Sequence, residues 1–413
     1  FIFATDSLAL TQHFSMPSIS TKGQSMPDSP IRELAPFAIA AKAAGRKVLH
    51  LNIGQPDIQT PNVALDAVRQ MDRTVIEYSP SDGFATYREG LAGYYGSVGV
   101  DVSPEQILVT TGGSEALIFA FQACLEPGDE VIIPEPFYAN YLGFAESAGV
   151  KVVPVTSFIE DGFALPPVAE IAAKVTDKTK AILICNPGNP TGYVYTDTEL
   201  HAIRSLVLEN DLYLFADEVY REFCYGDIPP RSVLSLEGMD DHVVLMDSVS
   251  KRYSMCGARV GALVTRNDAV RQACMRFAMA RLSPPTLGQI AGEAALKTPR
   301  SYFEEVKAAY VGRRDVLIEG LQAIPGVTVS NPGGAFYAMA KLPIDSSDAF
   351  CQWVLSDFHL NGETVMLAPA TGFYATPGAG IDEVRIAYVL EENTIRRAVA
   401  VIAAALQAYP GRS

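Results

Sequence analysis

The sequence predicts an α/β protein: a mostly parallel seven-stranded sheet sandwiched by helices, plus a smaller α+β domain. Three observations support this prediction. The chain has 413 residues, enough for about two or three domains. From about residue 106 to 265, β-rich runs alternate with helical segments, the pattern that crossover connections give in a parallel sheet. Beyond Pro299 one long amphipathic helix is followed by a different arrangement of strands and helices.

Residues 1–29 are expected to form a leader or an N-terminal arm, with an arm lying on a partner subunit as the alternative. Their apolar start has no Lys or Arg before it and Asp6 interrupts it, so a secretory signal is not expected. We expect residues 30–64 to form the N-terminal part of the small domain. Residues 65–300 are expected to form the large domain and residues 301–413 the C-terminal part of the small one.

Seven strands are predicted for the large domain, with helices between several of them. Thr196 and Glu199 form a capping box that predicts a helix over Thr196–Glu209. Because ligands of parallel sheets bind at the carboxyl ends of the strands, we expect the chemistry there. The predicted strands are Ile107–Thr110, Glu130–Ile133, Val150–Val155, Ala181–Cys185, Tyr213–Asp217, Val243–Asp247 and Gly261–Thr265.

In the small domain, Ser301 and Glu304 are predicted to open the long helix, and Pro325-Gly326 ends it. Three strands and two further helices should follow. The expected strands are Gly334–Leu342, Thr364–Leu367 and Val384–Leu390, and the expected helices lie near Asp348–Phe358 and Asn393–Tyr409.

Composition excludes several classes of protein. Apolar residues make up 48% and charged residues 19% of the chain, which excludes disordered and collagen-like proteins. A net charge of −15 gives no overall attraction for nucleic acid or anionic membranes, so neither is expected as a partner. The six cysteines and five histidines are scattered, which predicts free thiols, a cytoplasmic location and no metal site.

The first two strand ends of interest are rich in Gly, Asn and Pro. After Ile107–Thr110 come Gly112, Gly113 and Ser114 at the start of a helix, where exposed N–H groups favour an anion. An ordinary strand-to-helix turn is the alternative. After Ala181–Cys185, two Asn-Pro steps hold Asn189 in a rigid turn, and its amide can donate to an oxygen anion.

The next two strand ends carry ionisable groups. Asp217 ends an apolar strand with Tyr220 three residues later; a helix cap is the simpler explanation of such an aspartate. Lys251 follows Val243–Asp247, with Ser248 before it and Arg259 after it. Alone it would be a solvated surface lysine. Together these groups match the needs of an aldehyde cofactor with a phosphate, which a lysine can hold as a Schiff base.

The chain resembles the class I aminotransferases, pyridoxal-phosphate enzymes of fold type I, and within them the aspartate aminotransferase-like group. The segment Ser248–Gly261 fits the lysine attachment motif of that family along its whole length. NPGNPTG, DEVYREF, LNIGQPDIQTP (Leu51–Pro61) and NPGGAFY (Asn331–Tyr337) fit in order. Gln55, Ala258 and Arg252 depart from residues that are common in the family, and each can affect substrate choice.

The resemblance implies a role for each strand end. Lys251 would hold the cofactor and move the proton at the substrate α-carbon, which requires an amine that can lose its own proton. Asp217 would keep the pyridine nitrogen protonated, and Tyr220 and Asn189 would bind the phenolic oxygen of the ring. Asn189 would also reach the substrate carboxylate. The phosphate would lie on Gly113, Ser114 and Glu115, with Ser248 and Arg259.

Further roles follow from the same resemblance. Tyr138 would stack on the cofactor ring, with a packed core aromatic as the alternative. Tyr78 resembles the tyrosine that crosses to the phosphate of the partner site, which implies a homodimer. Arg385 lies on an apolar strand and needs an anion, either a substrate α-carboxylate or a core acid. The backbone of Gly54 would help to close the site over that carboxylate.

The expected reaction moves an amino group between an L-amino acid and a 2-oxo acid by a ping-pong cycle. A lyase or decarboxylase on the same fold is the alternative. A regulator with an aminotransferase-like domain is disfavoured, because a DNA-binding domain would not fit before residue 30. The resemblance favours aspartate-like or glutamate-like substrates, and aromatic amino acids are possible. Arg281 is the one weak candidate for binding a side-chain carboxylate.

Overall fold

The structure is a computed structural model, and it describes residues 17–27, 29, 32–226 and 231–412. The predicted leader therefore falls largely outside the described residues. Within it lies the short helix α1 (Thr21–Ser25), which contacts α6 (Asn140–Ala148) through a bond of 2.8 Å from Lys22 Nζ to the Ser147 carbonyl oxygen. None of the helices in the described part of the chain is long and apolar enough to cross a bilayer.

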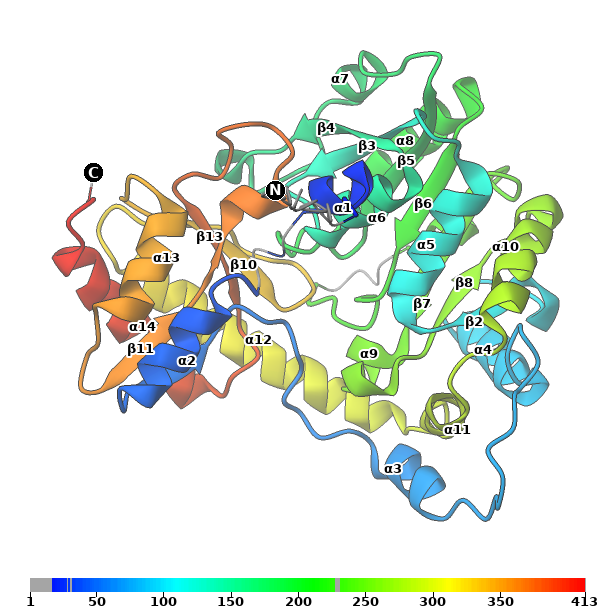
Figure 1. The fold of residues 1–413 in the computed structure, drawn as a ribbon, viewed down its shortest axis with the longest axis horizontal. Coiled ribbons are helices and arrows are strands. Elements are labelled where there is room, and N and C mark those ends of the chain that lie inside the picture. The colour runs from blue at the N-terminus through cyan, green and yellow to red at the C-terminus, as the bar shows by residue number, and fades with distance from the viewer. Residues whose placement is uncertain (1–16, 28, 30–31, 227–230, 413) are drawn as a thin grey trace, which may run out of the picture.

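A seven-stranded sheet forms the centre of the larger part of the molecule (Figure 1). Its order is β2-β8-β7-β6-β5-β3-β4, and β8 alone runs antiparallel to its neighbours. This confirms the prediction of a mostly parallel seven-stranded sheet. The strands are β2 (Ile107–Thr110), β3 (Glu130–Glu135), β4 (Lys151–Thr156), β5 (Thr179–Cys185), β6 (Tyr213–Asp217), β7 (Val243–Ser248) and β8 (Gly261–Val264).

Two helical layers cover this sheet because its strands are apolar on both faces. On β6, Leu214 and Ala216 pack into one core cluster and Phe215 into the other, as the two-residue period of a strand requires. Helices of the first cluster are α4 (Ala85–Ser97), α8 (Asp197–Glu209) and α11 (Thr286–Ala295). Those of the second are α5 (Gly112–Cys124), α6 and α10 (Asp268–Arg281). The shorter helices here are α3 (Asn62–Arg69), α7 (Val168–Ala172) and α9 (Val249–Arg252).

The predicted capping boxes had different outcomes. Thr196 caps α8, accepting from the amide of Glu199 while the Glu199 carboxylate accepts from the amide of Thr196, as predicted. The long helix α12 (Arg300–Gln322) begins one residue earlier than expected, with Pro299 as its N-cap and no side-chain cap. The expectation for Ser301 and Glu304 was therefore wrong. Proline before the first turn fixes φ and has no N–H to satisfy, so it starts the helix without a box.

The smaller part, at the left of Figure 1, combines an early segment, residues 35–50, with the C-terminal part of the chain. β1 (Lys47–His50) pairs in parallel with β11 (Glu363–Met366). A four-stranded antiparallel sheet runs β12 (Ala368–Pro369), β13 (Glu383–Ala387), β10 (Tyr337–Lys341) and β9 (Thr328–Val329). One core cluster holds these strands with α2 (Ala35–Ala43), α12, α13 (Ser347–Ser356) and α14 (Glu392–Ala408). This is the smaller α+β unit that the sequence predicts.

Candidate active site

The strand ends singled out in the sequence meet at one open cavity of about 570 Å³. β2, β5, β6 and β7 run in the same direction, so their carboxyl ends lie at one edge of the sheet. The predicted site residues that line this cavity are Gly54, Gly113, Ser114, Tyr138, Asn189, Asp217, Tyr220, Ser248, Lys251, Arg259 and Arg385.

Lys251 points across this cavity from the short helix that follows β7. Ser248 caps that helix, and its hydroxyl accepts a 3.1 Å hydrogen bond from the amide of Ser250. Lys251 Nζ donates to the carbonyl oxygen of Gly54 at 2.8 Å and lies 3.7 Å from Cys256 Sγ. Gly54 belongs to the segment after β1, so the lysine links the two parts of the molecule at the cavity.

Asp217 is a buried carboxylate with no cationic partner among the described residues. Its Oδ2 accepts from the Tyr141 hydroxyl at 2.8 Å, and its Oδ1 accepts from the Val219 amide at 3.3 Å. Burial, the largest effect, raises the pKa of Asp217 to about 6, although these two donors act in the opposite direction. A carboxylate held this way is suited to a cationic ligand atom.

Arg385 has the opposite charge to Asp217 and is also buried. Among the described residues it has no carboxylate partner. It reaches the cavity from β13, where Nη1 donates to Asn189 Oδ1 at 2.9 Å and Nη2 to the Asn52 carbonyl oxygen. Its Nε is buried and has no hydrogen-bond partner among the residues that the structure describes. Burial lowers the pKa of Arg385 from its ordinary value. An anionic ligand would satisfy both the charge and the free N–H groups.

The start of α5 and Arg259 form a site for an anion. Gly112 has φ +76°, and a Cβ there would lie 2.3 Å from Arg259 Nη2, so only glycine lets the guanidinium pack against this turn. Within the described part of the chain, Arg259 donates only to carbonyl oxygens, those of Cys256 and Thr111. Gly113 and Ser114 line the cavity beside it. The amides of the first turn of a helix and an unneutralised guanidinium favour a phosphate.

Three predicted residues lie elsewhere. The Glu115 carboxylate accepts from the Thr111 amide at 2.8 Å and pairs with Arg281 at 3.2 Å. Neither Glu115 nor Arg281 is among the lining residues. Tyr78 is 77% exposed and also lies away from the cavity.

The residues that line the cavity carry more positive than negative charge. Arg32, Lys251, Arg259 and Arg385 line it, against one carboxylate, Asp217. No ion pair within the described residues neutralises any of these four cations. A chain of net charge −15 thus concentrates positive charge here. The donor set fits pyridoxal phosphate, which brings a phosphate, a protonated ring nitrogen and an aldehyde for the lysine.

Several lining or supporting residues were missed by the sequence analysis. Tyr337 lies inside the quoted NPGGAFY motif, and Tyr141 close to Tyr138 in PEPFYANY, but neither was given a role. Cys256 lies inside the quoted segment Ser248–Gly261 and was also given no role. Arg32 had no signal, because an isolated arginine does not report which cavity it faces.

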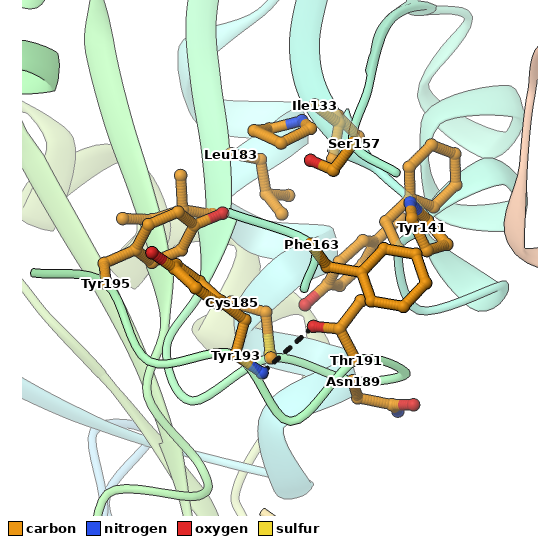
Figure 2. Close-up of a pocket in the computed structure, with 15 residues that line it drawn as sticks. Ile133, Tyr141, Ser157, Phe163, Leu183, Cys185, Asn189, Thr191, Tyr193 and Tyr195 are labelled. Atoms are coloured by element: carbon orange, nitrogen blue, oxygen red, sulfur yellow. Dashed lines mark hydrogen bonds between the residues drawn. The ribbon is translucent and has the colours of Figure 1, made fainter. Parts of the chain in front are cut away.

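A second, small cavity of about 30 Å³ lies behind the Asn189 loop (Figure 2). Its walls include Tyr141, Phe163, Cys185 and Tyr195, and the Thr191 hydroxyl within it accepts from the Tyr193 amide at 3.1 Å. Figure 2 shows the Asn189 side chain at its margin, pointing away from the other lining residues. Asn189 also lines the large cavity. The small one has room for about one or two waters only.

Comparison of the sequence with known proteins shows which family has this site. A family model described as "Aminotransferase class I and II" matches residues 46–402. The aspartate aminotransferase of Bacillus subtilis (strain 168) is 32% identical over 368 residues, 87% of this chain and 91% of that protein.

Solved structures give the same result. The aspartate aminotransferase from Thermus thermophilus with maleate matches with a TM-score of 0.86 at 30% identity, over 95% of this chain and 100% of that one. An alanine aminotransferase from Pyrococcus furiosus also matches with a TM-score of 0.86 at 30% identity, over 94% and 99% of the two chains. These two proteins are named for different substrates, so the fold alone does not fix the substrate.

Proposed function

Because this chain belongs to the class I and II aminotransferase family, we propose that the cavity transfers an amino group between an acidic L-amino acid and a 2-oxo acid. The chain is a pyridoxal-phosphate-dependent aminotransferase of fold type I. The lyase or decarboxylase alternative is not favoured.

Each of the predicted site residues that line the cavity has a task in this proposal. Bound pyridoxal phosphate supplies an aldehyde and a ring that accepts electrons from the substrate α-carbon. Lys251 Nζ would move one proton between the substrate α-carbon and the cofactor in each half of a ping-pong cycle. The Asp217 carboxylate holds the proton on the ring nitrogen, and Tyr220 and Asn189 donate to the phenolic oxygen. The Arg385 guanidinium binds the α-carboxylate.

The phosphate and the rest of the ring have further contacts in this proposal. The start of α5 at Gly113 and Ser114, with Ser248 and Arg259, holds the phosphate. Tyr138 covers the ring, and the Gly54 backbone closes over the α-carboxylate. Glu115 does not line the cavity and its carboxylate accepts from the Thr111 amide, so this proposal gives it no contact with the phosphate.

The charge balance of the cavity is the observation that favours an acidic substrate. Phosphate and α-carboxylate account for Arg259 and Arg385, which leaves Arg32 at the same cavity. Arg32 and Arg385 both act electrostatically on the Tyr138 phenol, whose pKa burial, the larger effect, raises to about 12. Arg32, Tyr138 and Arg385 line the same cavity, and we propose that a substrate with two carboxylates meets both guanidinium groups there. Arg32 replaces Arg281 as the candidate for the side-chain carboxylate.

Arg32→Gln is expected to raise the KM for aspartate and glutamate about tenfold or more, because a charge-assisted hydrogen bond is lost. The kinetic constants for alanine should change little, since alanine has no second carboxylate. A screen of amino donors against 2-oxoglutarate and oxaloacetate measures both. Arg300→Gln is the matched control, since the Arg300 side chain is 92% exposed and, among the described residues, forms an ion pair only with Glu304. An equal loss for alanine and aspartate would remove Arg32 from side-chain recognition.

We further propose that the enzyme is a homodimer with Tyr78 reaching the phosphate of the partner site. Exposed apolar side chains occur on the segment of Tyr78, at Val75 and Ile76, and on a second segment at Leu282. The segment of Tyr78 and the segment of Leu282 lie side by side, because the Ser81 hydroxyl donates to the Leu282 carbonyl oxygen at 2.6 Å. An exposed apolar patch of this kind is typical of a subunit interface.

Complementation tests the shared site. Tyr78→Phe should weaken phosphate binding about tenfold or more through one lost charge-assisted hydrogen bond, so it is assayed at limiting cofactor. Adding excess Lys251→Ala chains is expected to raise the activity per Tyr78→Phe chain, because each mixed dimer contains one intact site. The control is excess of the double variant, Lys251→Ala with Tyr78→Phe, which restores nothing. Subunit exchange without any rise would show that Tyr78 does not act across the interface.

We propose a cytoplasmic location from the cysteines. All six, which fall in the described part of the chain, are free. Unpaired cysteines are typical of proteins in reducing compartments.

A further inference from the structure

Tyr337 lies between the two residues that the proposed function assigns to cofactor and substrate. It is buried on β10. Its hydroxyl oxygen is 2.9 Å from that of Tyr220, and its ring faces the Arg385 guanidinium at 4.5 Å from the ring centre to Cζ. One side chain thus contacts both a donor to the cofactor and the α-carboxylate site.

The Gly54 backbone fixes the hydroxyl end of Tyr337. A Cβ on Gly54 would lie 1.7 Å from the Tyr337 hydroxyl oxygen, so only glycine lets the chain pass this closely. The carbonyl oxygen of the same glycine accepts from Lys251 Nζ at 2.8 Å. The Gly54 backbone therefore contacts both side chains: it packs tightly on the Tyr337 hydroxyl and accepts a hydrogen bond from Lys251.

Which of the two phenols donates in the hydrogen bond between them follows from the single hydrogen that each can give. A phenol has one hydrogen to donate. Burial and the neighbouring Tyr337 raise the pKa of Tyr220 well above its ordinary value, so that it keeps its proton. If Tyr220 gives that proton to the phenolic oxygen of the cofactor, Tyr337 must donate to Tyr220. A phenol that accepts a hydrogen bond is a stronger donor in turn.

The ring of Tyr337 has a separate effect on Arg385. Phe373 covers the guanidinium at 4.8 Å, and Tyr337 at 4.5 Å. With Nη1 bound to Asn189, two aromatic contacts restrict the plane in which the remaining N–H groups can meet a carboxylate.

We propose that Tyr337 is a positioning residue with two separable actions: its hydroxyl strengthens Tyr220 as a donor, and its ring orients Arg385. The inference rests on the proposed roles of Tyr220 and Arg385. A donor to the phenolic oxygen stabilises it most after the proton on the neighbouring Schiff-base nitrogen has left. Weakening that donor therefore raises the pKa of that nitrogen, which the absorbance of the bound cofactor reports.

The test is to separate these actions in the holoenzyme with three variants. Tyr337→Phe keeps the ring, so the pKa in the absorbance titration should rise by about 0.3 to 1 pH unit, with the Kd for maleate unchanged within about twofold. Phe373→Leu is the matched control and should raise the Kd for maleate about three- to thirtyfold without moving the pKa. Tyr337→Leu should do both. A purely structural role would lower thermal stability without this split.

Three results would overturn the inference, and two of them use Tyr220→Phe as the reference variant. If Tyr220→Phe moves the absorbance titration but Tyr337→Phe does not, the proposed function survives and the coupling between the phenols is wrong. If Tyr337→Leu leaves the Kd for maleate unchanged, the ring does not orient Arg385. If even Tyr220→Phe moves nothing, the role of Tyr220 is wrong and the inference fails with it.

Discussion

Replacing Lys251 with alanine is expected to lower transamination by about 10⁴-fold or more, the largest loss from any single change in this chain. Two functions end together, because the same amine binds the cofactor covalently and moves the α-proton. The fold should survive, since Lys251 is only partly buried and its polar contacts are with Gly54 and Cys256. Single-turnover rates with aspartate, measured in the presence of excess cofactor, separate the lost chemistry from weaker binding.

Borohydride reduction followed by peptide mapping identifies the lysine directly. The modified peptide should contain Lys251 in the wild-type enzyme and should be absent from Lys251→Ala. Lys341→Ala is the control, because Lys341 pairs with Glu160 on the surface of the protein and should leave the labelling and the rate unchanged. Reduction that places the cofactor on another lysine would overturn the assignment.

The sequence predicted the large sheet well because its signals are local. The alternation along β6, where Phe215 faces one helical layer and Leu214 the other, follows from the two-residue period of strands. The strand ends then converge by topology alone, because parallel strands share a carboxyl edge. Asp217 and Lys251 could therefore be placed at one site before any coordinates were known.

The contacts that tune the site could not be predicted, because they join segments far apart in sequence. Tyr337 meets Tyr220 across 117 residues, and no period or motif reports a distance between two phenols. Arg32 lies far in sequence from the cluster of strand ends. Arg281 was a reasonable candidate by type, but its cation is paired with Glu115 at 3.2 Å. Whether Arg32 or Arg281 remains without an ion-pair partner depends on tertiary packing, which the sequence does not report.

Asp217→Asn is expected to abolish most activity and yet stabilise the cofactor-free protein. An amide cannot hold the ring nitrogen protonated, so kcat should fall about 10³-fold. Burial raises the pKa of Asp217 from its ordinary value near 3.8 to about 6. The ionised group thus costs stability above pH 6, and that cost vanishes as the pH falls toward 4. At about 1.4 kcal/mol per pH unit, the cost is about 3 kcal/mol at neutral pH.

The neutral amide removes that cost at little expense in hydrogen bonds, because the Tyr141 hydroxyl can accept from the new NH₂ group. Thermal unfolding of cofactor-free protein should show a higher Tm for Asp217→Asn at pH 8 and a smaller difference at pH 5. The matched control is Asp247→Asn on the next strand. Burial also acts to raise the pKa of Asp247, but Arg252 and Arg221 hold it below its ordinary value.

The two aspartates should therefore respond with opposite signs. Removing the charge of Asp247 leaves Arg252 buried beside a neutral partner, so Asp247→Asn is expected to cost about 3–5 kcal/mol. Removing the charge of Asp217 leaves no cation behind in the cofactor-free protein, which is why the same substitution stabilises there. A carboxylate kept at a cost to the empty protein is explained if its partner arrives with the ligand. A lower Tm for Asp217→Asn at pH 8, or near-normal turnover with cofactor bound, would remove Asp217 from that role.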